Sequence, residues 1–266
     1  MTQSIPINML FTIVLISCIQ IVLVTSTTNE AAFAEQKITI LPDAHSNTAV
    51  RFIDVEDYFI PVGKALTWFN DDFVDHKLSL TNENNSTLIA SLDLKSNKSV
   101  DYTFKEPGKY YYSSKEYPKI QGSVGVLDRD DILVENITGL SNNVDVQLAW
   151  TPSEILLNQV DPVSNHGGDH NIDKARHTGS VDFMITFIDN KTGINQEHID
   201  YKFTINNELG NEIFRQGLHT TYGLEKAKYT FEKPGNFKPQ IMITHILFSP
   251  VDPAVANFDN IIHVKK

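Results

Sequence analysis

From Lys37 to the C-terminus, apolar and polar residues alternate with a period of two in short runs, which Gly, Pro, Asn and Asp separate. The clearest apolar positions are Val144, Val146, Leu148, Trp150, Val181, Phe183, Ile185 and Phe187. Such alternation places every second side chain on one face of a β-strand. Many short strands divided by turn residues are typical of β-sandwiches and barrels, so the pattern predicts an all-β protein.

One short pattern occurs twice and indicates two domains. Its copies are Tyr102-Thr103-Phe104, Pro107-Gly108 and Tyr110, then Tyr229-Thr230-Phe231, Pro234-Gly235 and Phe237. Because Pro and Gly favour turns, each copy predicts a strand, a turn and a returning strand. One related hairpin in each domain explains the repeat, and chance convergence on a common hairpin is the alternative.

The domain boundary is predicted at the charged stretch 128–131, which lies between the two copies. The first domain then covers residues 37–128 and the second covers residues 132–266. The segment 151–179 is rich in Asn, Asp and Gly and is predicted to be the longest loop.

The N-terminal segment 1–34 is interpreted as a secretion signal. Its apolar run, residues 9–24, precedes Ala32-Phe33-Ala34, which has the small-x-small form of a signal-peptidase site. A lipoprotein box around Cys18 is one alternative. An uncleaved membrane anchor is another, although Gln20 interrupts a run that must reach roughly 20 apolar residues to span a bilayer. All three interpretations predict export to an extracellular, cell-surface or periplasm-like location, with membrane contact only through this segment.

Composition narrows the classes of partner. The 266 residues carry a formal net charge of −11 and no run of Lys or Arg, which argues against nucleic acid because proteins bind it chiefly through phosphate charges. Cys18 is the only cysteine, so a cleaved chain has neither a disulfide nor a thiolate metal ligand. The expected partner is a protein or surface whose identity the sequence does not reveal.

The motifs of the first domain resemble those of the plastocyanin-like cupredoxins, which hold a blue type 1 copper ion. Residues 66–70 end in the family's W-x-N pattern before His76, and residues 102–126 contain its Y-x-F, P-G-x-Y-x-Y and P-x-x-x-G-x-V-x-V patterns. The resemblance implies a cupredoxin-like Greek-key sandwich for the first domain. We predict a second, immunoglobulin-like β-sandwich after it.

The copper ligands of that family are mostly absent. Its copper loop reads C-x-x-H-P-x-M, and here Ser114, Tyr117 and Ile120 occupy the Cys, His and Met positions, so the resemblance leaves only His76. Blue copper requires two imidazoles and a thiolate, which a serine hydroxyl does not replace. We therefore expect His76 to be a structural residue, with Tyr117 and Ile120 filling the vacated pocket. A weak metal site of His76 with Asp75 or Glu116 is the alternative.

Two further sets of residues are candidate metal ligands. His166, Asp169, His170 and His177 lie in the long loop, and imidazole with carboxylate suits Cu(II), Zn(II) or Ni(II). A solvated loop with incidental histidines is the favoured interpretation. The second set is His198, His219 and His245, whose convergence depends on the fold. A regular strand places His245 on the core side with Ile241 and Ile243.

No motif indicates an enzyme. The sequence lacks G-x-S-x-G, a phosphate-binding Gly loop and H-E-x-x-H, and acidic pairs such as Asp71-Asp72 are interpreted as turn residues or solvated charges. The chain is predicted to be an exported, cell-surface binding module that has lost its type 1 copper, with no confident cofactor. The alternatives are a copper-handling protein that uses the histidines of the second domain and, less favoured, a blue-copper electron carrier.

Overall fold

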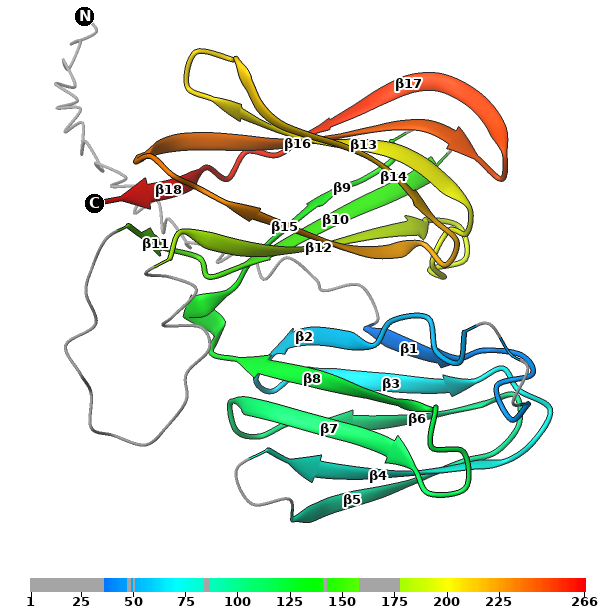
Figure 1. Cartoon of the computed structure of the whole chain (residues 1–266). Helices are drawn as coiled ribbons and strands as arrows, with labels where there is room; N and C mark the ends of the chain where they lie inside the picture. The colour runs from blue at the N-terminus through cyan, green and yellow to red at the C-terminus, as the bar shows by residue number, and fades with distance from the viewer. Residues whose placement is uncertain (1–35, 47–48, 50, 84–86, 141–142, 158–177) are drawn as a thin grey trace, which may run out of the picture. The chain divides into compact units, whose positions relative to one another are not determined.

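The computed structural model describes residues 36–46, 49, 51–83, 87–140, 143–157 and 178–266. These residues form β-strands and one 3-10 turn, η1 (Arg129–Asp131), and the described part contains no α-helix (Figure 1). Accordingly, no helix in those ranges is long and apolar enough to cross a membrane. The all-β prediction is confirmed.

The first sandwich contains two sheets, with strand orders β1-β3-β6 and β2-β8-β7-β4-β5 (Figure 1). The smaller sheet consists of β1 (Lys37–Ile40), β3 (Ala65–Asn70) and β6 (Lys98–Thr103). The larger consists of β2 (Asp57–Pro61), β4 (His76–Asn82), β5 (Leu88–Leu94), β7 (Gly108–Ser114) and β8 (Gln121–Leu127). Trp68 contacts Phe104 and Tyr112 in the core, with ring centroids 6.4 and 5.8 Å apart.

The second sandwich has a four-stranded and a six-stranded sheet. The smaller consists of β9 (Leu133–Ile137), β10 (Val144–Thr151), β12 (Ser180–Asp189) and β15 (Leu224–Thr230). The larger consists of β11 (Ile155–Leu156), β13 (Ile199–Asn207), β14 (Glu212–Thr220), β16 (Gly235–Ile246), β17 (Ser249–Asn257) and β18 (Ile262–Lys265). The alternating residues predicted for β10 and β12 are buried in one hydrophobic core, which confirms these two strands.

Both copies of the repeated pattern form a strand, a turn and a second strand, but the prediction that each copy is a hairpin is wrong. The strands before and after each Pro-Gly belong to different sheets, β6 and β7 in the first sandwich and β15 and β16 in the second. The reason is that Phe104 and Phe231, just before the turns, point into the cores, where they are 1% and 2% exposed. Each contacts the aromatic ring that follows its turn, with centroids 4.7 Å apart in both copies. The chain therefore crosses between sheets.

Both sandwiches belong to one compact unit of the chain. The predicted boundary at 128–131 coincides with η1, and the limits of the two domains stay a prediction. Part of the predicted long loop is ordered, because β11 pairs with β18 and Leu157 bridges Thr178.

A glycine in β8 allows the first core to close. A Cβ atom at Gly122 would overlap the Tyr112 hydroxyl and the Glu56 carbonyl, whereas a Cβ at Gly125 on the same strand meets its nearest atoms at 3.8 Å. We expect Gly122→Ala to lower the free energy of unfolding by about 1–3 kcal/mol. Gly125→Ala is the control and should change it by less than about 0.5 kcal/mol. Urea denaturation followed by tryptophan fluorescence measures both, and equal effects would contradict this account of Gly122.

Candidate functional site

A buried carboxylate organises one end of the first sandwich. The side chain of Asp72, between β3 and β4, is 0% exposed. It accepts hydrogen bonds from the imidazoles of His45 and His76 and from the backbone N–H groups of Asp43, His45 and Phe73, at 2.8–3.1 Å. A buried charge is tolerated only when hydrogen bonds satisfy it, as they do here. Asp72 is a turn residue, as one of the two interpretations expected, but the other interpretation, a solvated charge, is wrong.

The last residue of the W-x-N pattern positions this carboxylate. Asn70 is fully buried, and its Oδ1 accepts a hydrogen bond from the N–H of Asp72 at 3.0 Å. Its Nδ2 donates to the carbonyl oxygens of Val74 and Leu94 at 2.8 and 3.0 Å. Asn70 thus closes the turn that carries Asp72 into the protein and leads to His76.

The hydrogen bonds also determine the charge of Asp72. Burial by itself raises the pKa of a carboxyl, but the hydrogen bonds from His45 and His76, with those from the backbone, outweigh burial and lower the pKa of Asp72. The carboxylate is therefore ionised and can only accept hydrogen bonds. As a result, the ring nitrogens of His45 and His76 that face it act as donors.

The imidazole of His76 forms a hydrogen bond through one of its two ring nitrogens. Its Nε2 donates to Asp72 Oδ2 at 2.9 Å, and its side chain is 0% exposed. The other ring nitrogen, Nδ1, is buried and has no hydrogen-bond partner among the described residues. A carboxylate that fixes an imidazole in this way is the usual outer partner of a metal-binding histidine. The orienting contact is therefore present.

The residues at the other expected ligand positions do not complete a metal site. Ile120 is 0% exposed, and the ring of Tyr117 meets the ring of His76 edge-on, with centroids 5.0 Å apart. The Ser114 hydroxyl accepts a hydrogen bond from the N–H of Tyr117 at 3.1 Å, and the N–H of Ser114 donates to the carbonyl oxygen of Ile120 at 2.9 Å. One imidazole beside a hydroxyl, a phenol ring and an aliphatic side chain does not fit type 1 copper.

Asp75, one of the two carboxylates suggested as partners for His76, is already engaged by other residues. Asp75 is paired with Lys95 at 2.7 Å and accepts a hydrogen bond from the N–H of Ser96 at 3.0 Å, and the Lys95 contact lowers the pKa of Asp75. Glu116, Asp75 and His76 all line an open pocket of about 410 Å³. Within the described ranges, no group of three or more His, Cys, Asp or Glu residues has the arrangement to hold a metal ion.

The histidines of the second sandwich do come together, around a residue that sequence reasoning missed. Asp200 lies opposite His219 on β14 and His245 on β16. Its Oδ1 is 2.6 Å from Nδ1 of His219, and its Oδ2 is 3.5 Å from Nδ1 of His245. The ring of His198 lies 5.7 Å from that of His219. His219, Asp200 and His245 thus form a row across three neighbouring strands. The Asp200 carboxylate lies between the two imidazoles of this row.

His245 differs from its predicted position on the core side. Ile241 and Ile243 are fully buried, but the side chain of His245 is 42% exposed. The pairing of β16 with β17 changes register between Ile243 and His245. Such a bulge interrupts the alternation of faces, which is why the regular-strand expectation is wrong. The loop candidates His166, Asp169, His170 and His177 lie outside the described residues.

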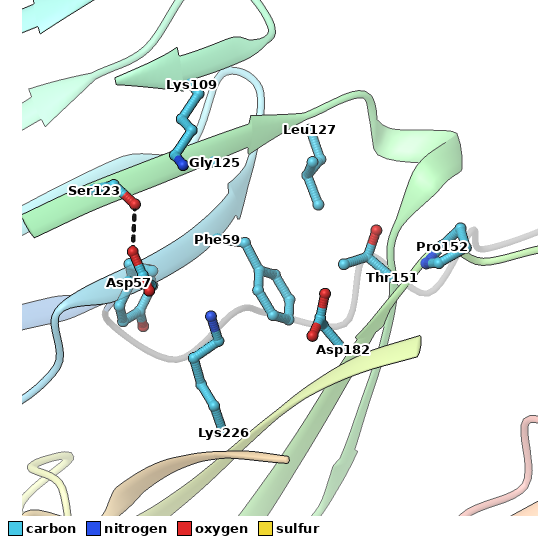
Figure 2. A pocket seen from close by; sticks show the side chains of 11 residues that line it. Asp57, Phe59, Lys109, Ser123, Gly125, Leu127, Thr151, Pro152, Asp182 and Lys226 are labelled. Atoms are coloured by element: carbon cyan, nitrogen blue, oxygen red, sulfur yellow. Dashed lines mark hydrogen bonds between the residues drawn. The ribbon is translucent and has the colours of Figure 1, made fainter. Parts of the chain in front are cut away.

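A smaller pocket, of about 260 Å³, is lined in part by β2 and β8 and contains charges of both signs (Figure 2). Ser123 donates a hydrogen bond to Asp57 at 2.5 Å, and Lys109, Asp182 and Lys226 also line the pocket. Small-molecule sites usually measure roughly 300–1,000 Å³, so this pocket is below the common size. The site at Asp72 and His76 is chemically better defined.

Comparison with known proteins places this geometry in context. No family model matches the chain. No curated protein matches it either. The solved structures similar to part of it include cupredoxins and a copper enzyme. A purple cupredoxin from Nitrosopumilus maritimus is 28% identical over 35% of this chain and 100% of its own length, with a TM-score of 0.32.

Two further similarities are of the same kind. A mutant of amicyanin in its Cu(I) form is 22% identical and covers 37% of this chain and 87% of its own, with a TM-score of 0.28. The copper-containing nitrite reductase of Thermus scotoductus is 16% identical over 35% of this chain and 22% of its own, with a TM-score of 0.29. Scores this low do not assign the chain to a family.

The hydrogen bonds of Asp72 predict a specific effect on stability. Asp72→Asn removes the charge that faces His45 and His76, and should lower the free energy of unfolding by about 2–4 kcal/mol at pH 7. Because the folded-state pKa of Asp72 is lowered, its contribution is present above the ordinary value of 3.8 and is lost as the pH falls through the folded-state pKa. The gap between the wild type and the variant should therefore narrow between pH 5 and pH 2.5 in urea denaturation.

The control is Asp75→Asn, which removes an exposed carboxylate from the same turn and should have a much smaller effect. A gap that stays unchanged down to pH 2.5, or equal losses in the two variants, would contradict the role of Asp72.

Proposed function

We propose that this chain is an exported binding module whose cupredoxin-like first sandwich does not hold type 1 copper. One observation carries the proposal. Asp72 and Tyr117 hold the buried ring of His76, while Ser114 and Ile120 close the surrounding loop with hydrogen bonds between protein groups. The position that corresponds to the family's copper is thus stabilised by protein contacts.

Electron transfer by the first sandwich is disfavoured on chemical grounds. The blue-copper redox couple depends on the copper–thiolate bond. Ser114 stands at the thiolate position, and its hydroxyl is already engaged by the backbone of Tyr117. We infer a binding role instead, and the net charge of −11 supports a partner other than nucleic acid. The apolar segment at residues 9–24 supports a cell-surface or extracellular partner.

A second candidate function is copper handling by the second sandwich. The row of His219, Asp200 and His245 supports it, because both imidazoles are about 40% exposed and face one carboxylate. The arrangement favours weak, exchangeable binding, since the ligands lie side by side on three strands and do not surround one point.

Metal loading distinguishes these functions. The chain is incubated with Cu(II) or Zn(II) and desalted, and retained metal and the visible spectrum are measured. We expect no intense thiolate-to-copper absorption, and the same spectrum for His76→Ala, because the thiolate and the second imidazole are absent. An intense visible band that His76→Ala abolishes would contradict the main proposal.

The same samples test copper handling. Copper that is retained by the wild type and lost in the double variant His219→Ala/His245→Ala would support the row around Asp200. Copper lost only in the triple variant His166→Ala/His170→Ala/His177→Ala would assign it to the loop instead.

A gain-of-function variant tests whether the orientation of His76 is sufficient. Ser114→Cys, Tyr117→His and Ile120→Met together supply the ligand types that are missing, and Nδ1 of His76 has no hydrogen-bond partner within the part of the chain that the structure describes. We expect the triple variant to bind about one Cu(II) with a strong visible band. Adding Asp72→Asn should weaken that binding about 10–100-fold, the usual effect of removing an outer carboxylate. A colourless triple variant that remains folded would show that the orientation of His76 alone does not prepare the site.

A further inference from the structure

A polar groove of about 500 Å³ lies on the second sandwich, where β13 leads into its turn toward β14. Asn206 and Gln240 face away from the core, since their neighbours Ile205 and Ile241 are fully buried. The polar side chains that line the groove are Asn206, Asn207, Glu208, Asn236, Lys238 and Gln240. Amides thus dominate the chemistry of this surface.

The amides are fixed in place by one another. Nδ2 of Asn206 donates to Oε1 of Gln240 at 3.0 Å, and Nε2 of Gln240 donates to Oδ1 of Asn257 at 2.5 Å. These residues belong to β13, β16 and β17, so the chain of hydrogen bonds crosses three adjacent strands. Oδ1 of Asn236 is 2.6 Å from Nδ1 of His263 on β18. Groups that are ordered before binding lose less conformational entropy when a ligand arrives.

The network leaves donors and acceptors available along the groove. Oδ1 of Asn207 accepts hydrogen bonds from the N–H groups of Leu209 and Asn211 in the turn, at 3.0 and 2.9 Å. Nδ2 of Asn207 and Nδ2 of Asn236 donate to no other described residue, and Oδ1 of Asn206 accepts from none. A surface that offers both donors and acceptors matches hydroxyl groups, each of which both donates and accepts.

The charged and apolar residues of the groove restrict the class of ligand further. Glu208 and Lys238 bring one negative and one positive charge to the groove, so it favours a neutral ligand. Ile261 also lines the groove and offers an apolar contact for the C–H groups of a sugar ring. A peptide strand instead gains specificity from several side-chain pockets, and this lining has a single large apolar residue.

We propose that this groove binds a short neutral oligosaccharide through the amides of Asn206, Asn207 and Asn236. The proposal rests on the proposed function, because it names a class of ligand for the binding module. The groove itself involves none of the residues around Asp72. Its volume lies within the usual range for small-ligand sites.

The test uses the ¹⁵N-labelled full chain, free of added metal, titrated to 10 mM with mannotriose, cellotriose, maltotriose and triacetylchitotriose. We expect at least one trisaccharide to shift the backbone amide signals of residues 206–211 and 236–240, with a Kd of about 0.1–1 mM. Asn206→Ala should weaken binding at least fivefold, and so should Lys238→Ala, because the ammonium of Lys238 lines the groove and can donate to a sugar hydroxyl. Lys238 is exposed and makes no internal hydrogen bond in the groove, so its variant keeps the test valid if Asn206→Ala is unstable.

The matched control is Gln216→Ala, an exposed amide on β14 of the same sheet that does not line the groove; it should bind as the wild type does. No shift with any of the four sugars, or equal affinity in all variants, would overturn the proposal. So would the same shifts with inorganic phosphate or a neutral decapeptide in place of the sugars. None of these results affects the metal-loading experiment, so the two proposals fail separately.

Discussion

The first sandwich depends on satisfying one buried negative charge. An ionised carboxylate in a protein interior is strongly unfavourable unless hydrogen bonds replace its water. Asp72 meets this requirement by drawing the segment around His45, the turn after Asn70 and the first residue of β4 to a single point. His45 lies 27 residues before Asp72 in the sequence, and the carboxylate links its segment to the turn and to β4. The orientation of His76 is a consequence of this linkage.

The parts of the structure that the sequence predicted are those with a local signal. Alternation is local, so it located β10 and β12 and the residues that they bury. The absent copper ligands are a matter of residue type, and Ser114 and Ile120 need no coordinates to be recognised as unsuitable. His76 was singled out by the resemblance, in which the W-x-N pattern leads to a copper histidine, and Asn70 explains that order physically through the turn that it closes.

The features that the sequence did not predict depend on contacts between residues far apart in the chain. No local pattern encodes such contacts. His45 meets Asp72 across 27 residues, and nothing near His45 in the sequence indicates this contact. Asp200 is central to the histidine row only because the register of β13 places it between β14 and β16. The bulge beside His245 and the crossing at Phe104 were missed for a related reason. A period of two states which face a residue occupies, and it does not state where the period breaks or which sheet the next strand joins.

The protein contacts around His76 also bear on how such a chain is supplied and maintained in a cell. Proteins whose folding energy comes from a bound metal are unfolded when the metal is scarce, and chelators denature them. Here the loop from Ser114 to Ile120 and the ring of His76 are secured by hydrogen bonds and packing between protein groups. If the first sandwich holds no copper, as proposed, its folding needs no metal, and its surface can change in what it recognises while these protein contacts keep the loop in place.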